Sequence, residues 1–238
     1  MTLLRPVSIL VSSAAPLAPA PSVASNIQGV ESSSTSTPTL AKGALSWSSG
    51  QLMDVLISIG SSPTLTDAAG DSDDVDGVIT NGGTTPKLYL RSWTVNGGAV
   101  DANLVFTLSG SSRAVMQAIV YSGATGRSAA AVTSSTGTAL LSPAITITGG
   151  PRNVLAMTAL NILGAHVTNP PDPPSGYTLV GTSLASTSDN PALTSRSTMA
   201  VAYKVVNDAT TSVAAAQWLG AEDYTSQAWN AISWAMYA

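Results

Sequence analysis

Short segments in which apolar and polar residues alternate recur along the chain from about Leu45 onward, and this period of two constrains the fold most. The segments at 51–59, 104–109, 116–121 and 199–205 are clear examples, and clusters of Gly, Asn, Ser and Pro separate them. Successive side chains of a strand point to opposite faces, so each segment predicts a strand with one apolar face.

About eight to ten such strands predict two packed antiparallel sheets. No convincing helical pattern competes, because the Ala-rich stretch at 211–218 carries Thr and Val, which favour strand. We therefore expect an all-β fold, an antiparallel two-sheet sandwich of jelly-roll type over residues 45–238. Only 5% of residues are aromatic, so Ala, Ser, Thr and Gly should allow the sheets to approach closely.

Residues 1–44 differ from the rest and predict an extended N-terminal arm followed by a Ser/Thr/Pro linker. Pro16, Pro19 and Pro21 disfavour both helix and central strand, and a Ser/Thr run follows at 32–37. Burial of the arm's side chains alone does not offset the conformational entropy lost on ordering it, so we expect backbone pairing with a partner as well. The expected partner-binding residues of the arm are aliphatic: Leu3, Leu4, Val7, Ile9, Leu10 and Val11.

A secretory leader is the competing interpretation of the same segment. Arg5 precedes the short apolar run, and the sequence at 18–20 resembles a cleavage site. Because Ser8, Ser12 and Ser13 interrupt the apolar run, we expect a retained arm.

Charge and composition exclude several classes of protein. Nine Lys and Arg residues against 13 Asp and Glu residues give a net charge of -4, which lacks the basic surface that nucleic acid requires. No window approaches the roughly 18 apolar residues of a membrane-spanning helix, so we expect no membrane partner. Only 9% of residues are charged, which is more natural in a protein that lives in an assembly than in an isolated monomer.

The order of these elements resembles a β-sandwich domain that recurs in structural proteins of tailed-bacteriophage virions and in some bacterial surface proteins. The virion examples include decoration, head-fibre and tail-fibre proteins. The resemblance rests on the segments 63–70, 88–95, 118–124, 173–180, 199–205 and 229–236. It covers residues from about Leu45 to Ala238, leaves the arm outside, and implies a structural or attachment module without catalysis.

Four aspartates in one short segment, Asp71, Asp73, Asp74 and Asp76, suggest a cation site, because hard cations bind several carboxylate oxygens. The spacing does not fit a helix-loop-helix calcium loop, since glycine occupies position 82, where a bidentate glutamate is needed. We expect a solvated acidic loop and no cofactor, with a cation there as the alternative.

Catalytic constellations are weak in this sequence. His166 is the single imidazole, and the segment 181–185 does not match a nucleophile elbow at its last position. Glu31 and Glu222 are the only glutamates, and neither lies in a motif typical of glycoside hydrolysis. We therefore expect no enzymatic activity.

Two tryptophans near the end of the chain predict a contact surface. Trp229 and Trp234 are five residues apart, so on one strand they point to opposite faces, and in a simple sandwich only one can be core. We expect Trp93 and Trp234 in the core, and Trp229 against a partner subunit or a ligand.

Together these features predict a phage virion structural protein, most simply a capsid decoration (cement) or head-fibre protein anchored by its N-terminal arm. Its expected location is the virion. Its expected partners are other virion proteins of the capsid, neck or tail and copies of itself, as a homo-oligomer that the resemblance suggests is a trimer. The alternative is a receptor- or carbohydrate-binding module of a tail fibre or bacterial surface protein, with exposed Trp or Tyr side chains at one end.

Overall fold

The computed structural model describes residues 16–41, 45–60, 63–69, 75–81, 86–95, 103–163, 171–185, 197–220 and 227–238; for 67–69, 75–81 and Trp93 it describes the backbone only. The regular structure of these residues is strand, with no helix among them. The prediction of an all-β fold is confirmed. No described helix is long and apolar enough to cross a membrane.

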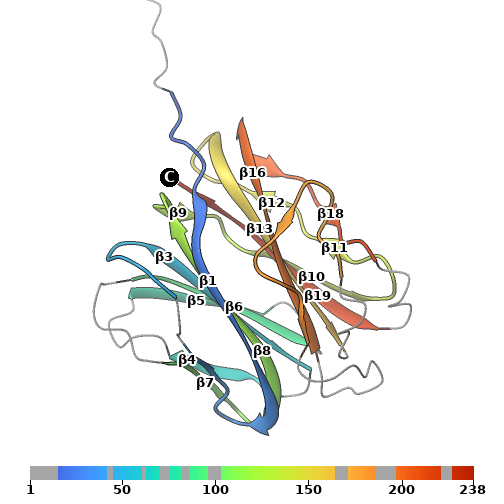
Figure 1. Cartoon of the computed structure of the whole chain (residues 1–238). Helices are drawn as coiled ribbons and strands as arrows, with labels where there is room; N and C mark the ends of the chain where they lie inside the picture. Colours follow the sequence, from blue (N-terminus) through green and yellow to red (C-terminus); the bar gives the residue numbers. More distant parts are fainter. Residues whose placement is uncertain are drawn as a thin grey trace, which may run out of the picture.

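Two antiparallel sheets form the centre of the molecule (Figure 1). The first sheet has the order β1-β8-β3-β6-β5. Its strands are β1 (Ser22–Thr35), β3 (Leu52–Ile59), β5 (Val75–Asn81), β6 (Lys87–Thr94) and β8 (Ser112–Ser122). The second sheet has the order β10-β19-β13-β16-β14, with β9 also paired to β19 and β15 to β16. Its strands are β9 (Gly126–Arg127), β10 (Ala131–Thr136), β13 (Arg152–Leu163), β14 (Thr178–Leu179), β15 (Leu184–Ala185), β16 (Ser197–Thr210) and β19 (Ala228–Tyr237).

The two sheets pack face to face through one apolar cluster, which we call the inter-sheet core. Leu56, Leu90 and Ile119 contribute from the first sheet, and Met157 and Trp234 contribute from the second. This arrangement confirms the sandwich-like fold.

Further layers cover the outer faces of both sheets. The outer face of the first sheet shares a core with a three-stranded sheet of β2 (Thr39–Ala41), β7 (Asn103–Leu108) and β4 (Leu65–Ala69). The outer face of the second sheet packs against two short strand pairs, β11 (Leu141–Ser142) with β18 (Ala216–Gln217), and β12 (Ile145–Thr146) with β17 (Ser212–Val213). In Figure 1, β4 and β7 lie at the lower left, and β11 and β18 lie at the right.

These outer layers bury the central strands on both faces, which differs from the expected single apolar face. Along β3, residues 53, 55, 57 and 59 lie on one face, as predicted, and pack in the core shared with the three-stranded sheet, which we call the outer core of the first sheet. Asp54 and Ser58 point the other way, into the sandwich, and are 0% exposed. The same burial holds along most of β8, β13 and β19, so the polar residues of these strands need internal hydrogen-bond partners.

Residues 22–41 correct the expected arm and linker. They form β1 and β2: β1 pairs with β8 from Ser22–Ser122 to Thr35–Ser112, and Leu40 of β2 is 1% exposed. The expected linker is wrong for these residues, because Ser22–Thr35, which contains the first four residues of the Ser/Thr run, is an edge strand of the first sheet. The arm residues 1–15 lie outside the described residues.

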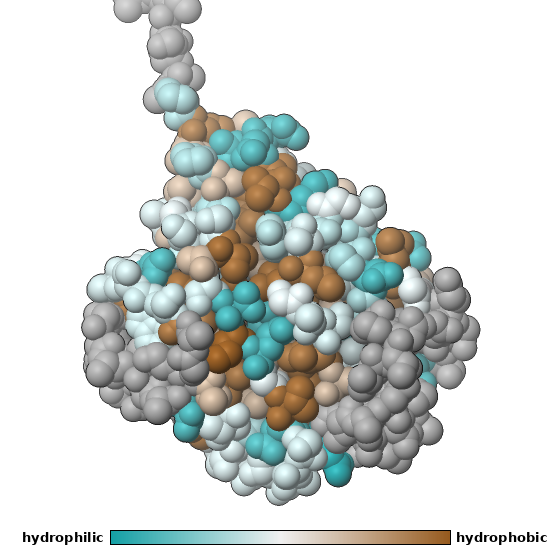
Figure 2. All heavy atoms as spheres, viewed as in Figure 1, coloured by the Kyte–Doolittle hydropathy of each residue, from teal (hydrophilic) through white to brown (hydrophobic). Residues whose placement is uncertain are grey.

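The surface carries few large apolar side chains. In Figure 2, apolar residues form patches along the middle of this face, between pale residues of intermediate hydropathy. The exposed large apolar residues of the described part are Leu17, Val30, Val132, Leu141, Val205 and Leu219.

Candidate functional site

Most of the predicted site residues lie outside the described residues. These are the arm residues Leu3, Leu4, Val7, Ile9, Leu10 and Val11, then Asp71, Asp73 and Asp74, and also His166; for Asp76 only the backbone is described. Among the described residues, no group of three or more His, Cys, Asp or Glu side chains is placed to hold a metal ion.

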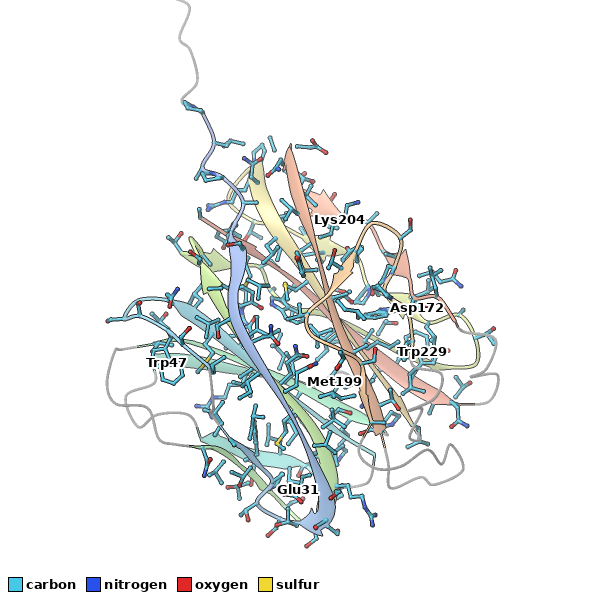
Figure 3. The ribbon with its side chains drawn as sticks, in the orientation of Figure 1. Glu31, Trp47, Asp172, Met199, Lys204 and Trp229 are labelled. Atoms are coloured by element: carbon cyan, nitrogen blue, oxygen red, sulfur yellow. The ribbon has the colours of Figure 1, made fainter. Side chains whose placement is uncertain are left out.

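Trp229 is the exception, and the structure corrects its expected role. Its side chain is 3% exposed and packs with Leu160, Ile162 and Trp218 on the outer face of the second sheet (labelled in Figure 3). Trp234 is in the inter-sheet core on the opposite face. Both tryptophans are therefore core residues, because an extra layer covers the face that a simple sandwich would leave open.

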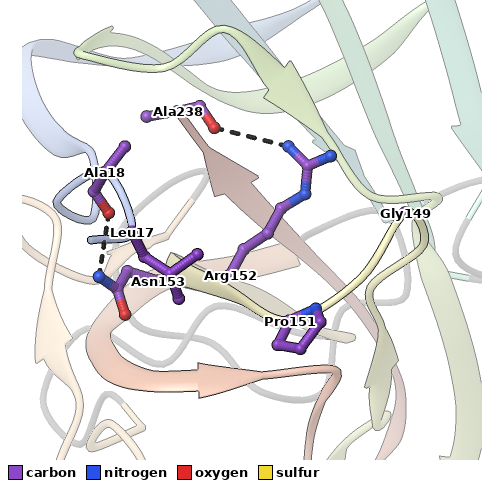
Figure 4. A pocket seen from close by; sticks show the side chains of 7 residues that line it. All are labelled: Leu17, Ala18, Gly149, Pro151, Arg152, Asn153 and Ala238. Carbon is purple, nitrogen blue, oxygen red and sulfur yellow. Dashed lines mark hydrogen bonds between the residues drawn. The ribbon is translucent and has the colours of Figure 1, made fainter. Parts of the chain in front are cut away.

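The segment that leads into β1 lies over a small pocket at one end of the second sheet (Figure 4). The pocket has a volume of about 240 Å³ and is lined by Leu17, Ala18, Gly149, Pro151, Arg152, Asn153 and Ala238. Asn153 Nδ2 donates to the Ala18 carbonyl at 2.9 Å, and Asn153 Oδ1 accepts from the Ala209 N–H at 3.4 Å. One amide side chain thus joins the segment before β1 to the ends of β13 and β16.

Arg152 forms one side of this pocket. Its guanidinium carbon lies 4.3 Å from the centre of the Tyr237 ring, and its Nη1 donates to the Ala238 carbonyl at 3.5 Å. Gly149 has a φ of +85°, and a Cβ there would lie 3.0 Å from Arg152 Nη2. Arginine, asparagine and small apolar groups suit the seating of a peptide segment.

Next to β1, hydrogen bonds from the Gln28 and Gln117 side chains join the first sheet to residues 180–182 of the second, and we call this contact the Gln28 clamp. Gln28 Nε2 donates to the Thr182 carbonyl at 2.7 Å, and Gln28 Oε1 accepts from the Thr182 N–H at 3.1 Å. Gln117 Nε2 donates to the Val180 carbonyl at 2.7 Å. Gly181 has a φ of +79°, and a Cβ there would overlap Gln28 Oε1. The N-terminal edge strand is thereby fixed to the second sheet.

The opposite margin of the second sheet ends at β10, whose six residues all pair with β19 in one continuous register. Val132 pairs with Ile232, which belongs to the inter-sheet core, so Val132 lies on the inter-sheet face. Its side chain is nevertheless 48% exposed. Within the described part of the chain, no strand pairs with the other side of β10.

A buried carboxylate joins the two sheets. Asp54 Oδ2 accepts from Tyr121 Oη at 2.7 Å and from Trp234 Nε1 at 2.6 Å. Ser92 Oγ donates to Asp54 Oδ1, and Arg127 Nη1 lies 3.9 Å from the same oxygen. Burial raises the pKa of the Asp54 carboxyl, although the Arg127 charge and the three hydrogen bonds oppose this shift.

The same surroundings shift the pKa of the Tyr121 phenol. Burial, together with the neighbouring Asp54 carboxylate, raises the pKa of Tyr121 well above its usual value. Tyr121 therefore stays a hydrogen-bond donor across the ordinary pH range. Asp54 and Tyr121 are both fully buried, so the carboxylate can hold β3, β6, β8 and β19 together, whereas the Arg127 side chain beside it is 16% exposed.

Comparison with known proteins finds no matching protein family, no matching curated protein and no matching solved structure. The class that the fold defines is a layered, antiparallel β-sandwich protein. Its function is therefore argued from this chain's own residues.

Sequence reasoning missed the Gln28 clamp, the Asn153 contact and the open edge of β10. In each of the first two, a side-chain amide donates to a backbone carbonyl more than 130 residues away in the chain, and no local pattern brings the two groups together. A signal for the third was present: β10 has no charged residue and no proline, whereas edge strands exposed to solvent are normally protected by such residues.

Proposed function

We propose that this protein is a non-enzymatic structural protein of a tailed-phage virion, of the capsid decoration or head-fibre type. In this proposal a jelly-roll type sandwich sits on the particle, and residues 1–15 anchor it to other virion proteins or to copies of itself. The anchor is shorter than the arm expected from the sequence, because residues 22–41 belong to the folded body.

The observation that carries the proposal is the way the anchor is joined to the body. Residues 16–21 lead from the anchor into β1, with Ala18 tied to Asn153 at the pocket. β1 then pairs with β8 over nearly its whole length, and the Gln28 clamp fixes it to the second sheet. A pull on residues 1–15 is thus distributed over both central sheets, as an attachment role requires.

The low charge of the chain supports the same role. Only 9% of the residues are charged, and pale residues of intermediate hydropathy make up much of the face seen in Figure 2. A surface of this kind has weak electrostatic repulsion between copies, which favours close packing in an assembly.

Deletion of residues 1–15 tests the proposal. We expect the truncated chain to keep the circular dichroism spectrum and unfolding midpoint of the full chain, while its loading onto particles lacking this protein is lost. A deletion through Ala41 is not a suitable test, because it also removes β1 and the buried Leu40. The full-length variant Val7→Ser/Ile9→Ser/Val11→Ser separates the loss of the apolar side chains from the loss of chain length, and it should load as poorly as the truncated chain. Normal loading of the truncated chain would contradict the proposal.

The alternative, a receptor- or carbohydrate-binding module, required exposed aromatic side chains at one end. Trp218, Trp229 and Trp234 are all buried. Trp47 is partly buried against the outer core of the first sheet. The described residues therefore support this alternative less than they support a structural role, and binding to a glycan array that is lost on Trp47→Ala would favour it again.

A further inference from the structure

Among the described residues, one side of β10 is an uncovered sheet edge. Its residues, Ala131–Thr136, pair with β19 without a register shift, and no described strand covers their other side. Every second residue therefore directs a backbone N–H and C=O away from the sheet, which is a template for another strand. The sequence Ala-Val-Thr-Ser-Ser-Thr contains no lysine, proline or acidic residue that would discourage such pairing.

The other sheet margins of the described part are less suitable acceptors. The register of β1 shifts between Val23 and Ser25 and again between Glu31 and Thr35, and the register of β5 shifts between Val75 and Val78. Such irregularities protect edges from pairing. The strands β14 and β15 have only two residues each, so they offer little length.

The exposed side chain of Val132 indicates what kind of strand would fit. Val132 lies on the inter-sheet face but is 48% exposed, because no described strand lies beyond β10. A strand added beside β10 would place every second side chain on this face, next to Val132. Apolar side chains at those positions would extend the inter-sheet core.

Residues 7–11 of the arm have the matching sequence. Val-Ser-Ile-Leu-Val has three β-branched residues, Val7, Ile9 and Val11, on one face of a strand, and it contains no charge. Pro6 comes just before it, a position where an edge strand tolerates proline.

The length of chain between Val11 and β1 allows this segment to reach another molecule. Ten residues separate Val11 from Ser22, but Ala18 is hydrogen-bonded to Asn153 of the same molecule, so the length free to extend from Pro16 to Val11 is that of residues 12–15, up to about 13 Å. Pro16, Pro19 and Pro21 keep φ fixed within this connection, which favours an extended path over a tight turn back onto the same molecule.

We propose that the edge of β10 left uncovered by the described strands accepts residues 7–11 of a second copy of this chain, which add to the second sheet as a further strand. The inference rests on the proposed function and names the partner of its anchor. Backbone hydrogen bonds to β10 supply affinity, and apolar side chains beside Val132 set the register.

Disulfide trapping tests the pairing directly, because the chain has no cysteine of its own. Full-length Ile9→Cys is mixed under mild oxidation with single-cysteine variants at each of positions 131–136. We expect a disulfide between the two different chains, strongest at one position and weaker on either side of it. Thr146→Cys, on an exposed position of the outer strand β12, is the control and should stay at background.

An edge-blocking substitution provides a second measurement. Ser134 is exposed and lies on the same face as Val132, so Ser134→Lys should leave the unfolding midpoint unchanged. We expect at least a tenfold weaker self-association in sedimentation velocity experiments, while the matched control Thr146→Lys associates like the unmodified chain.

Three outcomes would overturn the inference: no disulfide between the two different chains above the Thr146→Cys control; a disulfide that forms within one chain when Ile9→Cys is combined with a cysteine at 131–136, but does not form between chains; or unchanged self-association of Ser134→Lys. If deletion of residues 1–15 abolishes particle loading while these results are negative, the anchor binds elsewhere and the proposed function stands. If the deletion has no effect on loading, the proposed function fails as well.

Discussion

Replacement of Asp54 by alanine should destabilise the protein strongly, because this carboxylate serves hydrogen-bond donors from both sheets. Tyr121 Oη and Trp234 Nε1 both donate to Asp54 Oδ2, and both residues are fully buried. In Asp54→Ala these two donors remain in the core without an acceptor. A buried unsatisfied donor costs about 1–3 kcal/mol, so the two together cost about 2–6 kcal/mol.

Removal of the buried carboxylate itself offsets part of this cost. Its raised pKa shows that burial disfavours the charged form, even with Arg127 3.9 Å away. We therefore expect a net loss of about 2–5 kcal/mol in the free energy of unfolding, which is a large fraction of the roughly 5–15 kcal/mol typical of a domain.

Urea unfolding followed by tryptophan fluorescence measures this loss. Asp54→Asn is the informative companion, because an amide oxygen in place of Oδ2 still accepts from Tyr121 and Trp234, so it should cost less than half as much as Asp54→Ala. Asp172→Ala, at an exposed aspartate, is the control and should change stability by less than about 0.5 kcal/mol. An Asp54→Ala protein within about 0.5 kcal/mol of the unmodified chain would refute the reasoning.

The unmodified chain and Asp54→Asn should differ in how their stability depends on pH. Because the folded pKa of Asp54 lies above its unfolded value, the folded state binds the proton more tightly. The contribution of Asp54 is then fully present below the unfolded pKa and is lost as pH rises through the folded pKa. The stability of the unmodified chain relative to Asp54→Asn should therefore fall as pH rises through this window and stay constant above it; a rise would contradict the assignment.

Two further substitutions test other features of the core. Trp229 Nε1 has no hydrogen-bond partner among the described residues, whereas Trp234 Nε1 donates to Asp54, so Trp229→Phe should destabilise the protein less than Trp234→Phe in urea unfolding. Equal losses would contradict this difference. Gly181→Ala should lower the stability of the protein more than Gly150→Ala, because both glycines have positive φ but only Gly181 faces the Gln28 side chain. Backbone strain alone costs about 1–3 kcal/mol at either position, so thermal unfolding should show a larger loss for Gly181→Ala. Equal losses would contradict a stabilising role of the clamp.

The strand pattern predicts the fold class well, because the alternation of side chains along a strand is a local property. Residues 53, 55, 57 and 59 face a core as expected. The other face of β3 could not be assigned by the same reasoning, because Asp54 and Ser58 resemble solvent-facing residues in the sequence. Ser58 Oγ in fact donates to Asn161 Oδ1 at 2.7 Å, a partner 103 residues away on the other sheet.

The additional layers could have been anticipated in part. The segment that forms β13 reads Val-Leu-Ala-Met-Thr-Ala-Leu-Asn-Ile-Leu from residue 154, and such a nearly continuous apolar run is typical of a strand buried on both faces. With both faces of the second sheet covered, Trp229 and Trp234 need not compete for one core.

The N-terminal segment shows where local composition misleads. Prolines at 16, 19 and 21 and the Ser/Thr run at 32–37 indicate an unstructured connection, and a weakly apolar edge strand has no stronger signal of its own. What stabilises β1 is non-local: its pairing with β8 and the contact of Gln28 with Thr182, 154 residues away. Composition therefore places the start of the folded body about twenty residues too late.

The two margins of the sandwich differ in a way that bears on assembly. The clamp closes the margin at β1, whereas no described strand covers β10 on the margin beyond β19, so the donor segment and the acceptor edge are different surfaces of one chain. Contact between unlike surfaces is heterologous, and such contacts form rings when the rotation between copies closes and open chains when it does not. An isologous dimer would instead require one surface to face its own copy. A donor strand that adds to a neighbour's β10 is thus compatible with a closed trimer, in which each copy gives one strand and receives one.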